Sequence, residues 1–151
     1  MSLSLLCIVN DTGELIAPEW LSRALPVHRQ LREQLPPEPK TYRETLTDVF
    51  ASGGRLTLAV EGEAVKGLAL WRIISNTYEG RRFYVDDLVT DAASRSKGVG
   101  KALIGWLEQQ ARLRSCSVLA LESGVVRQGA HRFYFREGFS IPSFSFRKTL
   151  T

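Results

Sequence analysis

The sequence predicts an α/β domain whose mixed sheet carries helices on both faces. Short runs of β-forming residues, bounded by turn residues, alternate along the chain with amphipathic segments at helical spacing. The predicted order of elements is β-α-α-β-β-β-α-β-α-β. A chain of 151 residues, of which 44% are hydrophobic, suits a single domain that spans residues 1–151.

The N-terminal third of the chain predicts one strand and two helices. Residues 3–9 form a short β-forming run, and turn residues follow it. Apolar positions recur every three or four residues over residues 18–35, which predicts a helix that Pro26 breaks or kinks. The inward-facing positions of this helix are Leu21, Leu25, His28, Leu31 and Leu35. A second helix is predicted from the capping-box spacing of Thr41 and Glu44.

Three strands and a long helix follow. Residues 55–60 and 65–74 predict a hairpin around the turn 61–63, and residues 81–90 predict a third strand. A helix begins at Gly98, and residues 117–122 form the next strand. Because a β-α-β crossover joins parallel strands, the strand at 117–122 is expected beside the strand at 81–90.

The C-terminal residues predict one more helix and one more strand. Residues 128–137 carry an aromatic cluster at helical spacing, and Gly138 suits a helix C-cap. Residues 144–148 (FSFRK) alternate between apolar and polar side chains, which predicts a final strand.

Charge and cysteine content narrow the class of protein. A net charge of +4 and a pI near 9.3 suit an anionic ligand, although this signal is weak. The basic residues form no continuous tract, so nucleic acid is not an expected partner. Cys7 and Cys116 form no C-x-x-C motif, and with only two histidines no metal site is expected. Because no signal peptide or membrane-spanning run is recognisable, we expect a cytoplasmic protein without membrane contact.

A glycine-rich basic loop lies between the strand at 81–90 and the helix that follows. A Walker A loop does not fit it, because Arg95 and Ala102 stand at the first glycine and the hydroxyl position of that motif. A Rossmann fingerprint does not fit either, because Leu103 stands at its third glycine. The pattern that remains is R-x-x-G-x-G, formed by Arg95, Gly98 and Gly100.

This pattern suits an anion site at the start of a helix. The two glycines let a bulky anion approach the backbone, and the free amides and dipole of a helix start favour negative charge. Arg95, Lys97 and Lys101 add formal positive charge. The alternative is that the glycines only ease a tight strand-to-helix turn, but the three interleaved cations favour the anion site.

Two separate motifs resemble those of the GNAT superfamily of N-acyltransferases. Residues 89–103 resemble its acetyl-CoA signature, and residues 130–139 (AHRFYFREGF) resemble its second signature, A-x-x-[LF]-Y-x-x-x-G-F. The order of predicted elements also fits this family along nearly the whole chain. The resemblance implies a GNAT-like fold with a splayed central sheet. It also implies an enzyme that transfers acetyl from acetyl-CoA to a primary amine of a small molecule or a protein.

The resemblance assigns roles to individual residues. Those expected to face the pantetheine arm and the acyl group are Leu88, Val89 and Thr90. Those expected to hold the diphosphate are Arg95, Lys97, Gly98, Val99, Gly100 and Lys101. Tyr134 matches the family tyrosine that protonates the departing thiolate, although its aromatic surroundings alone would suggest a core residue. Arg127 stands where many members have asparagine, so either another group makes that contact or Arg127 reaches a CoA phosphate or an acidic substrate.

Asp86 and Asp87 are the catalytic candidates for handling the proton of the acceptor amine. An amine with a pKa of about 10.4 is mostly protonated at pH 7, so transfer benefits from a base or from a water chain that leads to one. Neighbouring residues of a strand point to opposite faces, so only one of the two is expected to reach a given side of the sheet. The resemblance to polyamine-acetylating members slightly favours Asp86. Alternatively, either carboxylate attracts and orients the ammonium, which favours a cationic acceptor.

Two functions other than an enzyme are compatible with parts of the sequence. A non-catalytic acyl-CoA-binding or sensing module would share the basic loop but would not need Tyr134. A nucleic-acid-binding domain rests on the pI alone and ranks low. A homodimer is frequent in the family that the chain resembles, although no residue indicates one.

Overall fold

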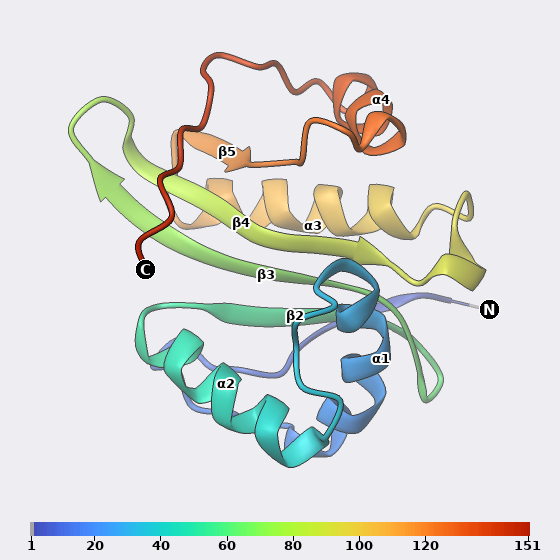
Figure 1. Cartoon of the computed structure of the whole chain (residues 1–151). Helices are drawn as coiled ribbons and strands as arrows, with labels where there is room; N and C mark the ends of the chain where they lie inside the picture. The colour runs from blue at the N-terminus through green and yellow to red at the C-terminus, as the bar shows by residue number, and fades with distance from the viewer. Residues whose placement is uncertain (1) are drawn as a thin grey trace. The chain divides into compact units, whose positions relative to one another are not determined.

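The computed structural model describes residues 2–151 as two compact units (Figure 1). The first unit ends at Ala120, and the second consists of Leu121–Thr151. Along the described residues the helices and strands follow the order β-α-α-β-β-β-α-β-α, which agrees with the predicted order as far as the last helix.

The described residues form a mixed sheet of five strands, and the last residue of the fifth strand, Leu121, is also the first residue of the second unit. The strands are β1 (Ser4–Cys7), β2 (Arg55–Glu61), β3 (Ala64–Asn76), β4 (Gly80–Thr90) and β5 (Val118–Leu121), and they lie in this order across the sheet. Strands β1 to β4 pair as antiparallel neighbours, whereas β4 and β5 point the same way (Figure 1). The predicted hairpin and the predicted parallel strand after the long helix are therefore confirmed.

Two helices cover one face of this sheet (Figure 1). They are α1 (Leu21–Leu31) and α2 (Pro39–Ala51), and a 3-10 turn, η1 (Pro18–Trp20), precedes α1. Their apolar side chains pack with the strands into one core, whose buried members include Leu25, Tyr42, Leu46, Leu58 and Leu68. Burial of each large apolar side chain stabilises the fold by about 1.5–3 kcal/mol, so this packing holds both helices on the sheet.

The starts and interiors of these helices differ from prediction in two places. Helix α1 continues through Pro26 without a break. Pro26 is exposed, so its ring meets solvent rather than the packed face, and the helix loses only one backbone hydrogen bond there. The capping box of Thr41 and Glu44 does not form, because Pro39 takes the first helical position and Thr41 lies inside the first turn.

The opposite face of the sheet is covered by α3 (Val99–Leu113) (Figure 1). Its buried side chains are Val99, Leu103, Ile104, Leu107 and Ala111. On the sheet, Trp71 stacks on Phe83 with ring centroids 4.7 Å apart, and Trp106 of α3 meets Trp71 edge-on at 6.0 Å. The predicted helix that begins at Gly98 is confirmed.

A β-bulge in β4 changes the face that its side chains reach. In the register with β3, Val85 pairs with Trp71 and Asp87 pairs with Leu70, so Asp86 is an extra residue without a direct partner. Trp71 packs toward α3, whereas Leu70 belongs to the core beneath α1 and α2. Paired residues share a face, so β4 faces α3 before the bulge with Val85 and faces α1 and α2 after it with Asp87.

The second unit contains α4 (Gln128–Arg136). Gly138 follows it with a φ of 92°, a left-handed conformation that suits the end of a helix, and the predicted cap is confirmed. The predicted strand at residues 144–148 is wrong, because these residues are irregular, and Phe144 and Phe146 are 83% and 92% exposed. Alternation gives a segment strand propensity, but a strand also needs a partner, and no described strand pairs with this segment.

Candidate active site

The loop between β4 and α3 presents backbone amides that no side chain caps. After β4 the chain makes a 3-10 turn, η2 (Ala92–Ser94), and α3 begins with Gly98 as its N-cap residue. Gly98 has a φ of 85°, and the space beside its Cα is open. The first bond of the helix runs from Ala102 N–H to Gly98 O at 3.0 Å, so the amides of residues 99–101 have no acceptor within the helix.

Three cations surround these amides. Arg95, Lys97 and Lys101 are exposed, and none of them forms an ion pair with another residue of the part of the chain that the structure describes. The first turn of α3 contains no acidic residue that would compete for its amides. Free amides and unpaired positive charge together suit a ligand with several anionic oxygens.

The C-terminal end of α1 is fixed to the point where this loop begins. Gln30 Nε2 donates to Asp91 Oδ1 at 2.7 Å, and Ala92 N–H donates to Gln30 Oε1 at 2.9 Å. The Asp91 N–H in turn donates to Lys66 O of β3 at 2.8 Å. These bonds hold the C-terminal end of α1 beside the start of the loop, directly after the last residue of β4.

The last residues of β4 lie close behind the loop. Leu88 and Thr90 are half-buried, and Val89 is buried in the core. Gly67 of β3 pairs with Thr90, and a Cβ on Gly67 would come within 2.8 Å of the Val89 carbonyl oxygen and 2.9 Å of a methyl carbon of Val99. The missing side chain at Gly67 lets the start of α3 pack directly against the end of β4.

Asp87 lies at the centre of a buried chain of hydrogen bonds. The residue is 8% exposed, and its Oδ2 lies 2.6 Å from His28 Nε2 of α1. Its Oδ1 accepts from Arg32 Nε at 2.7 Å. His28 Nδ1 lies 2.7 Å from the hydroxyl of Tyr42 in α2, so the chain of contacts joins both helices to β4.

Two groups of this chain have pKa values shifted from their ordinary range. Burial alone would raise the pKa of Asp87, but its hydrogen bonds to His28 and Arg32 lower that pKa below the ordinary value, so the carboxylate is ionised at neutral pH. Burial and the negative charge of Asp87 raise the pKa of Tyr42, so its hydroxyl keeps its proton. The His28 ring therefore bridges an ionised carboxylate at Nε2 and a protonated phenol at Nδ1.

Asp86, the bulge residue, is bound by a second arginine. Arg72 Nε donates to Asp86 Oδ1 at 3.0 Å, and Arg72 Nη2 donates to Asp86 Oδ2 at 2.5 Å. Arg72 also donates to the carbonyl oxygen of Ser52, which follows α2, at 3.0 Å. Arg32 Nη2 donates to the backbone carbonyl oxygen of Asp86 at 3.0 Å. The Asp86 side chain is 24% exposed and is the more open of the two carboxylates.

Both carboxylates therefore reach the face that α1 and α2 cover, and the expectation of opposite faces is wrong. That expectation assumed a regular strand, in which neighbouring side chains alternate. The bulge inserts one residue, so that Asp86 and Asp87 together oppose the single residue Leu70 and turn toward the same layer.

Tyr134 belongs to the second unit, where it packs among aromatic rings. Its ring centroid lies 5.5 Å from that of Phe133 and 5.6 Å from that of Phe139. Burial raises the pKa of Tyr134, and the positive charge of Arg127, the N-cap residue of α4, opposes this rise. The phenol consequently holds its proton at neutral pH, as a general acid must. Within the first unit, Asp86 and Asp87 lie on β4 and the basic loop follows the same strand. Tyr134 belongs to the second unit.

Comparison with known proteins assigns the chain to a family. The model of the acetyltransferase (GNAT) family matches residues 18–139, which include the basic loop and Tyr134. The chain belongs to the GNAT acetyltransferase family. This GNAT chain is 35% identical over 134 residues to the uncharacterized N-acetyltransferase YhdJ of Bacillus subtilis (strain 168), a match that covers 86% of the chain and 91% of that relative.

A second relative and a solved structure extend the comparison. The chain is 35% identical over 66 residues to the aminoalkylphosphonate N-acetyltransferase of Salmonella typhimurium (strain LT2), which covers 44% of the chain and 43% of that protein. The crystal structure of a transcriptional regulator from Bacillus halodurans C-125 superposes with a TM-score of 0.81 and 21% identity, covering 99% of this chain and 100% of the other. At that identity the likeness supports the fold alone, and the predicted GNAT-like fold is confirmed.

Four residues that shape this GNAT site were not predicted to do so from the sequence. They are His28, Arg32, Tyr42 and Arg72. The sequence did place His28 on an inward helical face, and a buried polar atom needs a partner, so a polar contact of His28 was foreseeable. The sequence held no signal for the two arginines, because their pairing depends on the bulge.

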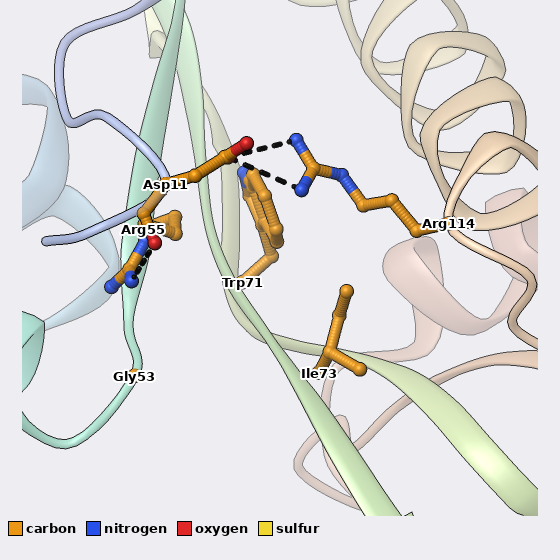
Figure 2. A pocket seen from close by; sticks show the side chains of 6 residues that line it. All are labelled: Asp11, Gly53, Arg55, Trp71, Ile73 and Arg114. Carbon is orange, nitrogen blue, oxygen red and sulfur yellow. Dashed lines mark hydrogen bonds and ion pairs between the residues drawn. The ribbon is translucent and has the colours of Figure 1, made fainter.

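A separate cavity of about 210 Å³ lies elsewhere in the first unit (Figure 2). Its lining residues are Asp11, Gly53, Arg55, Trp71, Ile73 and Arg114. Arg114 Nη1 and Nη2 each lie 3.2 Å from Asp11 Oδ1, and the guanidinium carbon lies 5.1 Å from the Trp71 ring centroid. Arg114 follows the last residue of α3, at the end of the helix remote from the basic loop, so this cavity is not part of the candidate site.

Within residues 2–151, no helix has both the length and the apolar character needed to cross a membrane. The same residues contain no cluster of three or more histidine, cysteine, aspartate or glutamate side chains that could hold a metal ion.

Proposed function

We propose that this chain is an acetyl-CoA-dependent N-acetyltransferase that transfers the acetyl group directly to a primary amine. The observation that carries this proposal is the basic loop, with its uncapped amides at residues 99–101 and its unpaired cations. A diphosphate offers several anionic oxygens, and charge-assisted hydrogen bonds to such oxygens are strong. Family membership and the names of both relatives agree with this reaction class.

The end of β4 is the proposed site of the acyl-CoA arm. Ser117 N–H donates to Arg81 O at 2.9 Å near the start of β4, and β5 ends at Leu121, whereas β4 continues to Thr90. The last residues of β4 therefore extend beyond β5, which supports a splayed edge. In this proposal Leu88, Val89 and Thr90 contact the pantetheine arm, and Arg95, Lys97, Gly98, Val99, Gly100 and Lys101 hold the diphosphate.

The reaction requires one bond to form and one to break. The amine nitrogen attacks the thioester carbonyl carbon, a C–N bond forms, and the C–S bond breaks to release the CoA thiolate. We assign to Tyr134 the proton that the thiolate receives. Burial raises the pKa of Tyr134 and the positive charge of Arg127 opposes that rise, so Arg127 would also stabilise the phenolate that forms before solvent restores the proton.

The two aspartates have different proposed roles. Asp86 has the more exposed carboxylate, so we propose that it receives a hydrogen bond from the acceptor amine while water carries the amine proton to solvent. Asp87 is buried and has a lowered pKa, which makes it a poor proton acceptor. Its proposed role is to position Arg32 and the end of α1.

The experiment that tests this function follows the release of free thiol from acetyl-CoA. Purified protein is mixed with acetyl-CoA and a panel of amines that includes a polyamine, amino acids, a lysine peptide and 2-aminoethylphosphonate, and products are identified by mass spectrometry. The expected result is an N-acetylated product and a matching amount of CoA, with turnover strongly reduced in Tyr134→Phe. Absence of turnover with every amine would overturn the proposal, and CoA binding without turnover would favour a non-catalytic acyl-CoA-binding or sensing module.

A further inference from the structure

The two carboxylates at the β4 bulge are neutralised by two arginines. Arg72 donates to both oxygens of Asp86, and Arg32 donates to Asp87. His28 is the other partner of Asp87, with its Nε2 2.6 Å from Asp87 Oδ2. Because each carboxylate already has a guanidinium partner, this part of the site does not select a purely cationic acceptor through its charge.

Arg32 is the member of this cluster that faces solvent. Its side chain is 42% exposed, whereas those of Asp87, Arg72 and Asp86 are 9%, 20% and 24% exposed. Its Nε and Nη2 bind Asp87 and the carbonyl oxygen of Asp86, which fixes the plane of the guanidinium. Within residues 2–151, the Nη1 group makes no hydrogen bond, so its two N–H donors remain free.

Arg32 also occupies a suitable place along β4. It binds the carbonyl oxygen of the bulge residue Asp86, two residues before Leu88, where the proposed acyl-CoA arm begins. Gln30, two residues earlier in the chain, binds Asp91 and Ala92 where the basic loop begins. The end of α1 therefore lies alongside the last residues of β4, where an amine would meet the acetyl group in the proposed reaction.

We propose that Arg32 binds an anionic group of the acceptor, so that the substrate is a small amine that also carries a carboxylate or a phosphonate. This inference rests on the proposed N-acetyltransferase function of the same site. A guanidinium held along its Nε–Nη2 edge presents its remaining donors in the planar geometry that such anions match. The amino end of the acceptor then lies beside the Asp86 carboxylate. This carboxylate is close to Arg32, because Arg32 donates to the backbone carbonyl oxygen of the same residue.

The competing role for Arg32 is purely structural. In that role the arginine only completes the Asp87 network, and its loss would slow the reaction with every acceptor to the same extent. A role in binding an anion instead predicts a loss that depends on whether the acceptor carries the anion. The two roles are therefore separated by comparing acceptors that differ in this group alone.

The test uses pairs of amines that share one skeleton and end either in a carboxylate or in its neutral amide. The full chain is assayed with acetyl-CoA and glycine, β-alanine or γ-aminobutyrate, each against its amide, and the ratio of kcat/KM for acid over amide is recorded. Comparing this ratio between the wild type and Arg32→Gln cancels the intrinsic reactivity of each amine. We expect the ratio for at least one pair to fall by about 10-fold or more, mainly through KM of the acid, because a charge-assisted contact is lost. Arg32→Lys, which keeps the charge but not the fork, should give an intermediate ratio.

The matched control is Arg29→Gln. Arg29 lies on the same end of α1, but its Nε donates to the Leu35 carbonyl oxygen at 3.0 Å and not to an aspartate. This variant should leave the acid-to-amide ratio unchanged. Equal losses with acids and amides in Arg32→Gln would overturn the inference alone, whereas no transfer to any amine would overturn the proposed function and this inference with it. If Arg32→Gln does not fold, the test uses Arg32→Lys and the wild type. At saturating acetyl-CoA, rising salt should then raise the wild-type KM of the acid more than that of the amide.

Discussion

Replacement of Asp87 by asparagine tests the buried network that holds α1 and α2 against β4. Asparagine has nearly the same volume, so the packing is retained while the charge is lost. The contact with His28 at 2.6 Å changes from a charge-assisted to a neutral hydrogen bond, which costs about 1 kcal/mol. The contact with Arg32 is partly screened because the Arg32 side chain is 42% exposed, and its loss adds about 0.5–1 kcal/mol. An amide group facing the Arg32 donors adds a further cost, so we expect a total loss of about 2–3 kcal/mol.

The pH dependence of this loss follows from the lowered pKa of Asp87. Folding lowers that pKa from its ordinary value of 3.8, so the unfolded chain binds this proton more readily than the folded chain does. The stabilisation by Asp87 is therefore complete above about pH 4, and it is lost as the pH falls through the folded pKa. The stability gap between the wild type and Asp87→Asn should narrow by about 1.4 kcal/mol per pH unit in this range.

The assay is urea unfolding of both proteins at several pH values between 7 and 3, supported by thermal unfolding at pH 7. For a chain of 151 residues the expected loss corresponds to a fall in Tm of about 4–12 °C. Asp48→Asn, the same change at an exposed position of α2, should alter the free energy of unfolding by less than about 0.5 kcal/mol. Two results would refute the reasoning. One is a difference in free energy of unfolding between the wild type and Asp87→Asn below about 0.5 kcal/mol at pH 7, and the other is a difference that does not narrow at acid pH.

Three further predictions use the same structure. Tyr42→Phe removes the hydroxyl 2.7 Å from His28 Nδ1 and leaves a buried nitrogen unpaired, so the free energy of unfolding in urea should fall by about 1–2 kcal/mol; an unchanged value would show that this hydrogen bond is not made. Gly67→Ala forces a methyl group to within 2.8 Å of the Val89 carbonyl oxygen, so it should cost about 1–3 kcal/mol and weaken CoA binding in calorimetry. Its control, Gly105→Ala, lies in α3 with open space around it and should be neutral or stabilise by up to about 1 kcal/mol. Burial raises the pKa of Tyr134, so turnover should not decline through loss of its proton until above about pH 10, and a decline centred near pH 8 that Tyr134→Phe abolishes would contradict this account.

Much of the fold could be predicted because its signals are local. The apolar periodicity of α3, the turn between β2 and β3, and the positive φ of Gly138 each follow from a short stretch of sequence. The strand at residues 144–148 could not be predicted in this way. Its alternating side chains favour a strand, but a strand forms only where another strand pairs with it, and that partner would lie elsewhere in the chain.

The candidate site was predicted in part for the same reason. The basic loop is contiguous, so its glycines and cations could be recognised together and the structure places them at the start of α3. The partners of Asp86 and Asp87 are separated from them by many residues, and the bulge that turns both carboxylates to one face leaves no mark in the burial pattern of β4. The ion pairs of Arg32 and Arg72, which change the charge of the site, therefore became evident only in three dimensions.

The most direct test of the central claim is calorimetric titration of CoA, with pantetheine as a ligand that lacks the diphosphate. The protein is compared with a variant that combines Arg95→Gln, Lys97→Gln and Lys101→Gln, and with a charge-matched control that changes the exposed residues Lys40, Arg43 and Arg112 to glutamine. The account predicts that the loop variant binds CoA at least about 100-fold more weakly, with a reduced dependence on salt, while its affinity for pantetheine and the CoA affinity of the control are retained. Equal CoA affinity in the wild type and the loop variant would contradict the claim that this loop holds the diphosphate of acetyl-CoA.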